Sequence, residues 1–133
     1  MVRRCCCGLL ALLPLTVSLA PALAGDSFPF GTTLMLDAAP MRGSKRVPML
    51  EIAENGAASI DLWCASATAK AIVNDNSITI AAWNTYDVQC EPERHARDGE
   101  LLAALSGVTG WRRKGEVVEL LGATPLRFRL MTN

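Results

Sequence analysis

The sequence predicts a mainly antiparallel β domain of six or more hairpin-linked strands, with one helix inserted late in the chain. Three observations carry this prediction. Segments of alternating apolar and polar residues flank two turn-forming sequences, Asn55-Gly56 and Asn74-Asp75-Asn76. A helical apolar stripe lies between Pro92 and Ser106. Alternating segments then resume as far as the C-terminus, which is typical of an α+β domain.

The first hairpin is predicted after a mixed segment in which only a short strand, Thr32–Leu36, is expected. Its arms are Val47–Glu54 and Ala57–Ala65, joined by Asn55-Gly56. This dipeptide favours a two-residue turn with positive φ at both positions.

Alternation in the second arm of this hairpin divides its side chains between two faces. The core face is predicted to carry Ile60, Leu62 and Cys64. The opposite face is predicted to carry Ser59, Asp61 and Trp63. Trp63 therefore either packs in a second layer of the core or belongs to an exposed aromatic patch, and we expect core packing.

A second hairpin is predicted with arms Ala69–Val73 and Ser77–Trp83. The connecting residues, Asn74–Asn76, tolerate turn geometry and are expected to form a three-residue turn. Ile78, Ile80 and Ala82 alternate with Thr79 and Ala81 along the second arm. A polar stretch then leads to Cys90.

The helix is predicted over Pro92–Ser106. Proline suits the first turn of a helix, and Glu91 and Glu93 complement the positive end of the helix dipole. Gly107 stands where a C-terminal cap belongs. The apolar stripe consists of Leu101, Leu102 and Leu105. The first half is weaker because it contains Gly99 and polar residues where packing favours apolar ones: Arg94, His95 and Asp98.

The chain after the helix returns to strands. A third hairpin is predicted from Val108–Arg113 and Glu116–Leu121, with a turn at Lys114-Gly115. After a further turn at Gly122–Pro125, one set of side chains is predicted to point inward: Leu126, Phe128 and Leu130. Arg127 and Arg129 are predicted to face solvent.

The N-terminal residues are typical of an export signal. Arg3 and Arg4 precede a leucine-rich run without charge, which ends in the small-residue sequence Ala22-Leu23-Ala24. We therefore predict a signal peptide over residues 1–24, cleaved after Ala24, and a bacterial periplasmic or secreted protein. An uncleaved anchor is the alternative, because the run is about long enough to span a bilayer. Cys5–Cys7 lie at the start of the run, where a lipoprotein signal does not place its cysteine, and are expected to leave with the peptide.

The mature chain, residues 25–133, is long enough for a single domain. The 13 basic side chains fall to 11 once Arg3 and Arg4 are removed, against 13 acidic ones. This near-neutral balance offers no electrostatic case for nucleic acid or an anionic membrane as partner. No second apolar run approaches bilayer length, so no membrane span is expected after cleavage.

Two of the five cysteines, Cys64 and Cys90, remain in the mature chain. An even count in an oxidising compartment indicates a disulfide. Two buried free thiols are one alternative. A metal site with His95 is another, although zinc ligands are usually more closely spaced than these.

The residue patterns indicate no catalytic site and no cofactor. His95 is the only histidine and is expected to be exposed on a polar helix face. Ser66 and Ser106 lack a Gly-x-Ser-x-Gly context, and no glycine-rich loop opens a helix. The carboxylates around the helix fit neither a calcium loop nor a pair of opposed acids: Glu91, Glu93, Asp98 and Glu100.

One candidate binding face is the segment Trp111, Arg112, Arg113 and Lys114. The three basic residues either lie in a solvent-exposed turn or contact an anion. The aromatic residues Trp63, Trp83 and Trp111 either pack in the core or mark a binding surface.

The order of these features resembles the META domain, the family of the HslJ-like envelope proteins of bacteria. A strand ends in Cys64, and a second cysteine starts the helix at Cys90-Glu91-Pro92. After the helix come Val117-Val118-Glu119-Leu120 and Leu126-Arg127-Phe128, and the resemblance covers roughly residues 28–131. The chain departs from the family pattern in having Trp63 and Ala65 where glycine and asparagine usually flank the first cysteine.

The resemblance implies a small barrel-like sheet packed against one helix, an envelope location and no known catalytic residues. It also implies a link to stress tolerance, antibiotic resistance or motility. The leading hypothesis is thus a non-enzymatic envelope accessory protein that binds an unknown envelope protein or small ligand. The alternative is a periplasmic inhibitor of lysozyme-type enzymes, because the segment from Ser106 to Lys114 loosely resembles such inhibitors, whose serine and lysine enter the lysozyme cleft.

Overall fold

The computed structural model describes residues 27–86 and 88–132, which fold into eight strands and one helix. The predicted signal peptide and its cleavage site lie outside these residues. The elements are, in order, β1 (Leu34–Leu36), β2 (Met49–Ile52), β3 (Ala57–Asp61), β4 (Ser66–Asn74), β5 (Ser77–Tyr86), α1 (Pro92–Ser106), β6 (Val108–Lys114), β7 (Val117–Gly122) and β8 (Leu126–Leu130).

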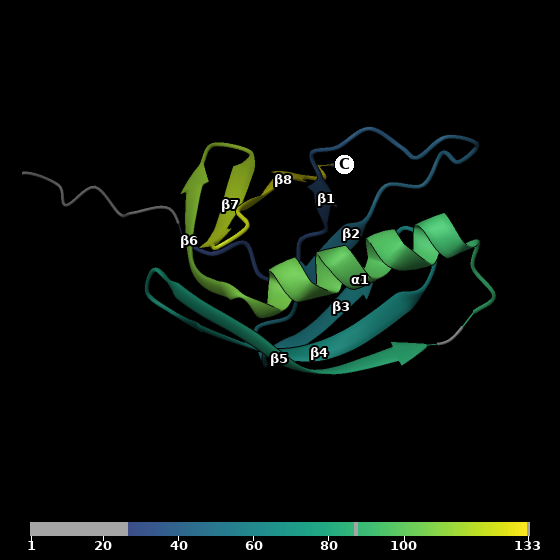
Figure 1. Cartoon of the computed structure of the whole chain (residues 1–133). Coiled ribbons are helices and arrows are strands. Elements are labelled where there is room, and N and C mark those ends of the chain that lie inside the picture. The colour runs from purple at the N-terminus through teal and green to yellow at the C-terminus, as the bar shows by residue number, and fades with distance from the viewer. Residues whose placement is uncertain (1–26, 87, 133) are drawn as a thin grey trace, which may run out of the picture.

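Each strand pairs antiparallel with the next one along the chain, and β1 also pairs with β8, so the sheet closes into a barrel. The predicted fold class is confirmed: the molecule is mainly β, with a barrel-like sheet and a single helix (Figure 1). The weakest junction lies between β5 and β6, whose registered pairing is limited to Ser77 and Gly110. The helix is inserted in the chain at this junction and packs against β5.

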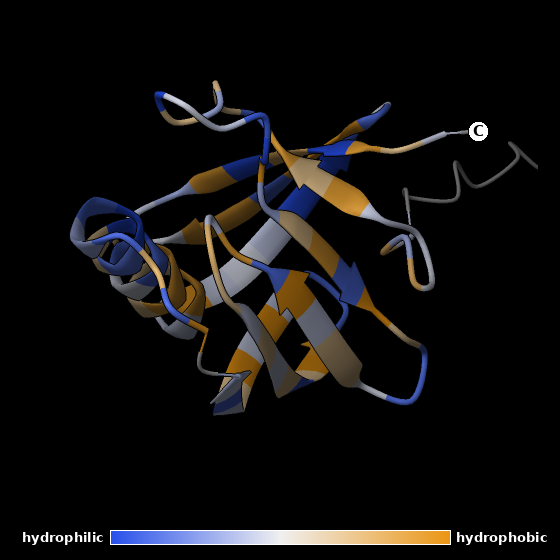
Figure 2. Cartoon of the chain, turned by 90° about the vertical axis from the view of Figure 1, so that its right-hand side faces the viewer, coloured by the Kyte–Doolittle hydropathy of each residue, from blue (hydrophilic) through white to orange (hydrophobic). Residues whose placement is uncertain are grey.

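The core lies inside the barrel and under α1, and it follows the predicted alternation along the strands. Orange apolar positions alternate with blue or pale ones along the strands in Figure 2. The largest fully buried side chain is Phe128, joined by aliphatic residues from several strands: Leu34, Leu50, Ile52, Ile60, Ile78, Ile80, Val118 and Leu120. Each such side chain contributes about 1.5–3 kcal/mol when it is fully buried.

The first hairpin is confirmed, but its turn differs from the prediction. Asn55 does not have positive φ, whereas Gly56 does, at +86°. The Gly56 N–H donates to Ala53 O, and the Ala53 N–H donates to Ala57 O, which makes a three-residue loop. The asparagine has a different role, because its Oδ1 accepts a hydrogen bond from the Ala57 N–H at 3.0 Å.

The second hairpin is also confirmed, with longer strands and a shorter turn than predicted. Asn74 pairs with Ser77, so the turn consists of Asp75 and Asn76 alone. β4 begins earlier than predicted, at Ser66, and β5 ends later, at Tyr86, with three successive exposed residues at its end. The register shifts between Thr68 and Lys70, opposite a residue with positive φ, Ala82.

The helix has the predicted bounds, but its C-terminal end and its polar half differ from expectation. Gly107 follows it with φ −94°, which is not the left-handed cap conformation, and its N–H donates to Ala103 O and Ala104 O. Leu101 and Leu105 are buried as predicted. Asp98, in the half that the sequence marks as weakly packed, is also buried, because it accepts hydrogen bonds from a turn of the barrel.

The third hairpin and the last strand follow the prediction closely. The turn after β6 shifts by one residue to Gly115-Glu116, since Lys114 still belongs to the strand. Phe128 is fully buried, whereas Arg127 and Arg129 are exposed. Over the part of the chain that the structure describes, no helix is long and apolar enough to cross a bilayer.

Candidate functional site on β6, β7 and β8

The outer face of β6, β7 and β8 carries two rows of side chains that run across the strands. In the first row, Arg112 lies opposite Glu119, and Glu119 opposite Arg127. In the second row, Lys114 lies opposite Val117, Val117 opposite Arg129, and Arg129 opposite Met35 of β1. Residues two apart on a strand share a face, so both rows point outward. We call this surface the basic face.

Charges alternate along the first row. Arg112 binds Glu119 through two nitrogens, with Nε at 2.9 Å and Nη2 at 2.6 Å from Oε2. Arg127 and Arg129 share one carboxylate, that of Asp37, at 3.3 Å and 3.2 Å. These pairs are solvent-exposed and stabilise the fold only slightly, but they hold the guanidinium groups in place.

A hollow of about 600 Å³ lies over this surface. It is lined by residues of all three strands: Arg112, Arg113, Lys114, Val117, Glu119 and Arg127. Five of these six side chains are charged, and four of those five are basic. Such a lining favours an anion, which arginine binds through paired N–H donors.

Three of the four residues predicted for the binding face thus lie at this hollow, and Trp111 does not. Its side chain points to the opposite side of β6 and is 6% exposed. The indole Nε1–H donates to Asp75 O at 2.7 Å, and the ring packs edge-on against Phe28. Neighbours in a strand face opposite ways, so Trp111 points away from Arg112. Arg113 has the parity of Trp111 but is only half-buried near the end of β6, where it still borders the hollow. The core interpretation is confirmed for Trp63 as well, which is 4% exposed.

Arg127 and Arg129 were predicted to face solvent, but no link between them and Arg112 or Lys114 was predicted. A signal for this link is nevertheless present in the sequence. Basic residues two positions apart occur on β6, as Arg112 and Lys114, and on β8, as Arg127 and Arg129. Only β7 lies between these two strands in the chain. Consecutive antiparallel hairpins put such pairs on one surface.

The second cluster of predicted residues surrounds the Cys64–Cys90 disulfide, which is present. Cys64 lies in a tight turn in which the Leu62 N–H donates to Ala65 O. This turn interrupts the predicted alternation, so Cys64 is half-buried and faces Cys90 at the start of α1 rather than continuing the core row.

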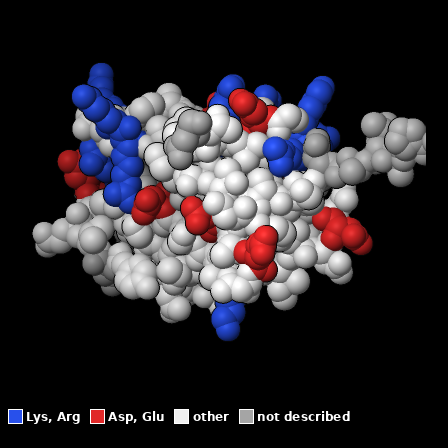
Figure 3. Space-filling model, turned by 180° about the vertical axis from the view of Figure 1, so that it is seen from behind, with Lys and Arg blue, Asp and Glu red and all other residues white. Residues whose placement is uncertain are grey.

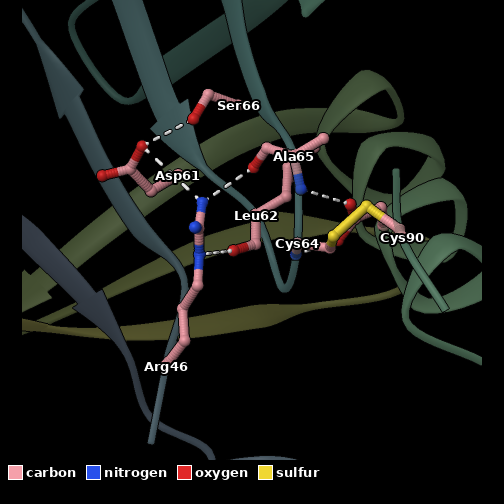
Figure 4. Close-up of polar contacts among 8 residues, drawn as sticks. Arg46, Asp61, Leu62, Cys64, Ala65, Ser66 and Cys90 are labelled. Carbon is pink, nitrogen blue, oxygen red and sulfur yellow. Dashed lines mark hydrogen bonds and ion pairs between the residues drawn. A yellow bond between two sulfur atoms is a disulfide. The ribbon is translucent and has the colours of Figure 1, made fainter. Parts of the chain in front are cut away.

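Two polar side chains, Arg46 and Asp98, hold this turn, and Figure 4 shows the contacts of Arg46. Arg46 donates from Nε to Leu62 O at 2.7 Å and from Nη2 to Ala65 O at 2.9 Å. Asp98 accepts the N–H groups of Cys64 and Ala65 at 3.1 Å and 2.9 Å. Burial of Asp98 is therefore compensated by two charge-assisted hydrogen bonds. No sequence pattern pointed to either contact, since the partners are distant in the chain.

The remaining candidates take structural or solvent-exposed positions. His95 is exposed on the polar side of α1, as predicted, and no cluster of three or more metal-ligating side chains occurs within residues 27–86 and 88–132. Ser106 donates to Leu102 O within α1, and Lys114 ends β6. The whole of β6 separates these two residues, about 20 Å at the usual rise of a strand, so the geometry gives no support to their joint entry into a lysozyme cleft.

Two solved structures share this fold. One is the NMR structure of a protein from Burkholderia xenovorans, with a TM-score of 0.63 and 18% identity, over 86% of this chain and 96% of the other. The second is another NMR structure of a protein, with a TM-score of 0.59 and 15% identity, over 74% of this chain and 88% of the other. No curated protein matches the chain.

The family comparison agrees with the order of elements described above. The META domain model matches residues 31–132, which include every strand of the barrel and the helix. The chain therefore belongs to the META domain family.

Proposed function

We propose that this protein is an exported, non-enzymatic envelope protein of the META type that binds an anionic partner through its basic face. The observation that carries the proposal is the hollow bordered by Arg112, Arg113, Lys114 and Arg127. A role in stress tolerance or antibiotic resistance is consistent with its family.

Two features support export. The N-terminal residues have the pattern of a signal peptide, and disulfides such as Cys64–Cys90 persist mainly in oxidising compartments. Cell fractionation followed by thiol alkylation tests this part. A processed chain in the envelope fraction, with both cysteines protected from alkylation, is expected; a full-length chain in the cytosol would contradict it.

A non-enzymatic role is supported by the chemistry of the hollow. Its side chains are guanidinium groups, one ammonium, one carboxylate and a valine. Histidine and cysteine, the usual general base and nucleophile, do not line it. Turnover of an envelope substrate that stopped on substitution of His95 would refute this part.

Binding is tested with inorganic tripolyphosphate as a soluble anionic probe. The chain from Gly25 to Asn133 is suitable, because the closed barrel is formed entirely within it. Calorimetry is expected to show binding that weakens as salt is added. Arg112→Gln with Lys114→Gln should weaken it at least about tenfold, since each substitution removes a charged donor from the hollow.

The matched control is Lys45→Gln with Lys70→Gln, which removes the same net charge elsewhere. Both lysines are exposed, and β4, which carries Lys70, lies four strands from β8 in either direction around the barrel. Equal loss of affinity in the two variants would mean that net charge, and not the basic face, governs binding.

A further inference from the structure

The two rows of the basic face differ in charge balance. The first row is close to neutral, because Glu119 pairs with Arg112 and Asp37 lies beside Arg127. The second row contains no carboxylate. Of its two cations, Lys114 and Arg129, Arg129 forms an ion pair with Asp37. Surplus positive charge therefore gathers along the second row.

Apolar side chains are interleaved with these cations. Val117 lies between Lys114 and Arg129 in the register, and Met35 follows Arg129. Met131 is two residues beyond Arg129 and is 43% exposed, which is high for a large apolar side chain. A soluble anion would leave these groups in water. An anionic amphiphile would cover both the charges and the apolar tips.

The same edge is where the chain enters the barrel. Arg113 Nη1 donates to the carbonyl oxygen of Ser27 at 3.4 Å. In the sequence, Ser27 closely follows the run Cys5–Gly25, which contains no charged residue. The described part of the chain therefore begins beside Arg113, on the strand that also carries Lys114 of the second row.

Charge is also unevenly distributed over the rest of the molecule. On the side away from α1, most Lys and Arg side chains lie toward the upper margin of Figure 3, with some Asp and Glu side chains beside them, and the other Asp and Glu side chains lie across the middle. An acidic surface is repelled by an anionic bilayer, so only a basic margin can approach it closely. This distribution favours one orientation of the protein on such a surface.

We propose that the second row, together with Arg113 and Met131, seats the domain on the surface of an anionic lipid bilayer. This inference rests on the proposed function and names its partner. The cations approach the lipid headgroups, and the apolar side chains reach the boundary of the acyl region. The proposed contact is peripheral.

The test is cosedimentation of the chain Gly25–Asn133 with vesicles of phosphatidylcholine, with and without phosphatidylglycerol. Binding is expected only with phosphatidylglycerol, and it should fall as salt is added. Lys114→Gln with Arg129→Gln should weaken it about 25-fold, since each basic residue near an anionic surface contributes about a factor of five. The Lys45→Gln, Lys70→Gln variant should bind as tightly as the wild type.

A second variant separates lipid from soluble anion. Met131→Gln should lower the affinity for vesicles and leave the affinity for tripolyphosphate unchanged. Wild-type protein that binds tripolyphosphate but no vesicles would overturn the lipid assignment and keep the proposed function. Binding to neither would overturn both, and equal binding to both kinds of vesicle would overturn the role of the cations.

Discussion

Asp98 and Cys64 are 34 positions apart in the chain, yet the carboxylate of one accepts the backbone N–H of the other at 3.1 Å. The same cysteine is bound covalently to Cys90, just before α1. The helix is thus attached twice to one turn of the barrel, once by a disulfide and once, about two helical turns later, by hydrogen bonds.

Because Asp98 attaches the helix to the turn by hydrogen bonds, Asp98→Ala is expected to lower the free energy of unfolding substantially. The substitution leaves the N–H groups of Cys64 and Ala65 without their acceptors in a buried position. We expect a loss of about 2–4 kcal/mol in the free energy of unfolding. Urea denaturation of the oxidised protein measures it. Glu100→Ala on the same helix breaks only an exposed ion pair with Arg97 and should cost less than about 1 kcal/mol.

Removal of the Cys64–Cys90 disulfide is expected to lower the free energy of unfolding independently of Asp98. Closing the loop between Cys64 and Cys90, a sequence separation of 26, is worth about 3.5 kcal/mol in the chain-entropy model. Cys64→Ser with Cys90→Ser should lower the free energy of unfolding by a similar amount. Far-ultraviolet circular dichroism should stay unchanged, because Arg46 and Asp98 still hold the turn. Loss of the β spectrum at low temperature would contradict this expectation.

Two glycines should respond to alanine in opposite directions. Gly56 has φ +86°, and a Cβ there would lie 2.6 Å from Ala71 O, so Gly56→Ala should destabilise the protein by more than about 1 kcal/mol, the usual scale of such strain. Gly99 lies in α1, and a Cβ added to it would have no atom within 4 Å. Gly99→Ala should stabilise the protein by up to about 1 kcal/mol. Thermal unfolding of both variants checks the pair.

Trp111→Phe should separate stability from binding. The variant keeps an aromatic ring beside Phe28 but loses the indole hydrogen bond to Asp75 O. We expect a decrease of roughly 1–2 kcal/mol in the free energy of unfolding, with unchanged affinity for tripolyphosphate. Weaker binding of tripolyphosphate by a stably folded variant would instead show that Trp111 contributes to the binding surface.

Local signals in the sequence were sufficient for most of the fold. Asn55-Gly56 and Asn74–Asn76 located two hairpins, and Pro92 marked the start of the helix, because turn and cap preferences act over a few residues. The exact turn geometry was missed at Asn55, where the loop has one residue more than the dipeptide favours. The disulfide was predicted from the cysteine count and the export signal.

Features that depend on register or on distant contacts could not be predicted in this way. The basic face requires the pairing of three strands, and Arg46 and Asp98 find their partners 16 to 34 positions away. Net charge was also a poor guide. Net charge averages over the chain, whereas the structure brings Lys114 and Arg129 together in a row that contains no carboxylate.

The sparse pairing between β5 and β6 has a consequence for self-association. Beyond Ser77, β5 has no registered partner on its β6 side within the described residues, and such an edge can pair with another copy of the chain. The helix packs against β5, and the disulfide fixes the start of that helix. The Cys64–Cys90 bond and the contacts of Asp98 together therefore oppose aggregation as well as unfolding, since releasing α1 would uncover a strand edge that another molecule could extend.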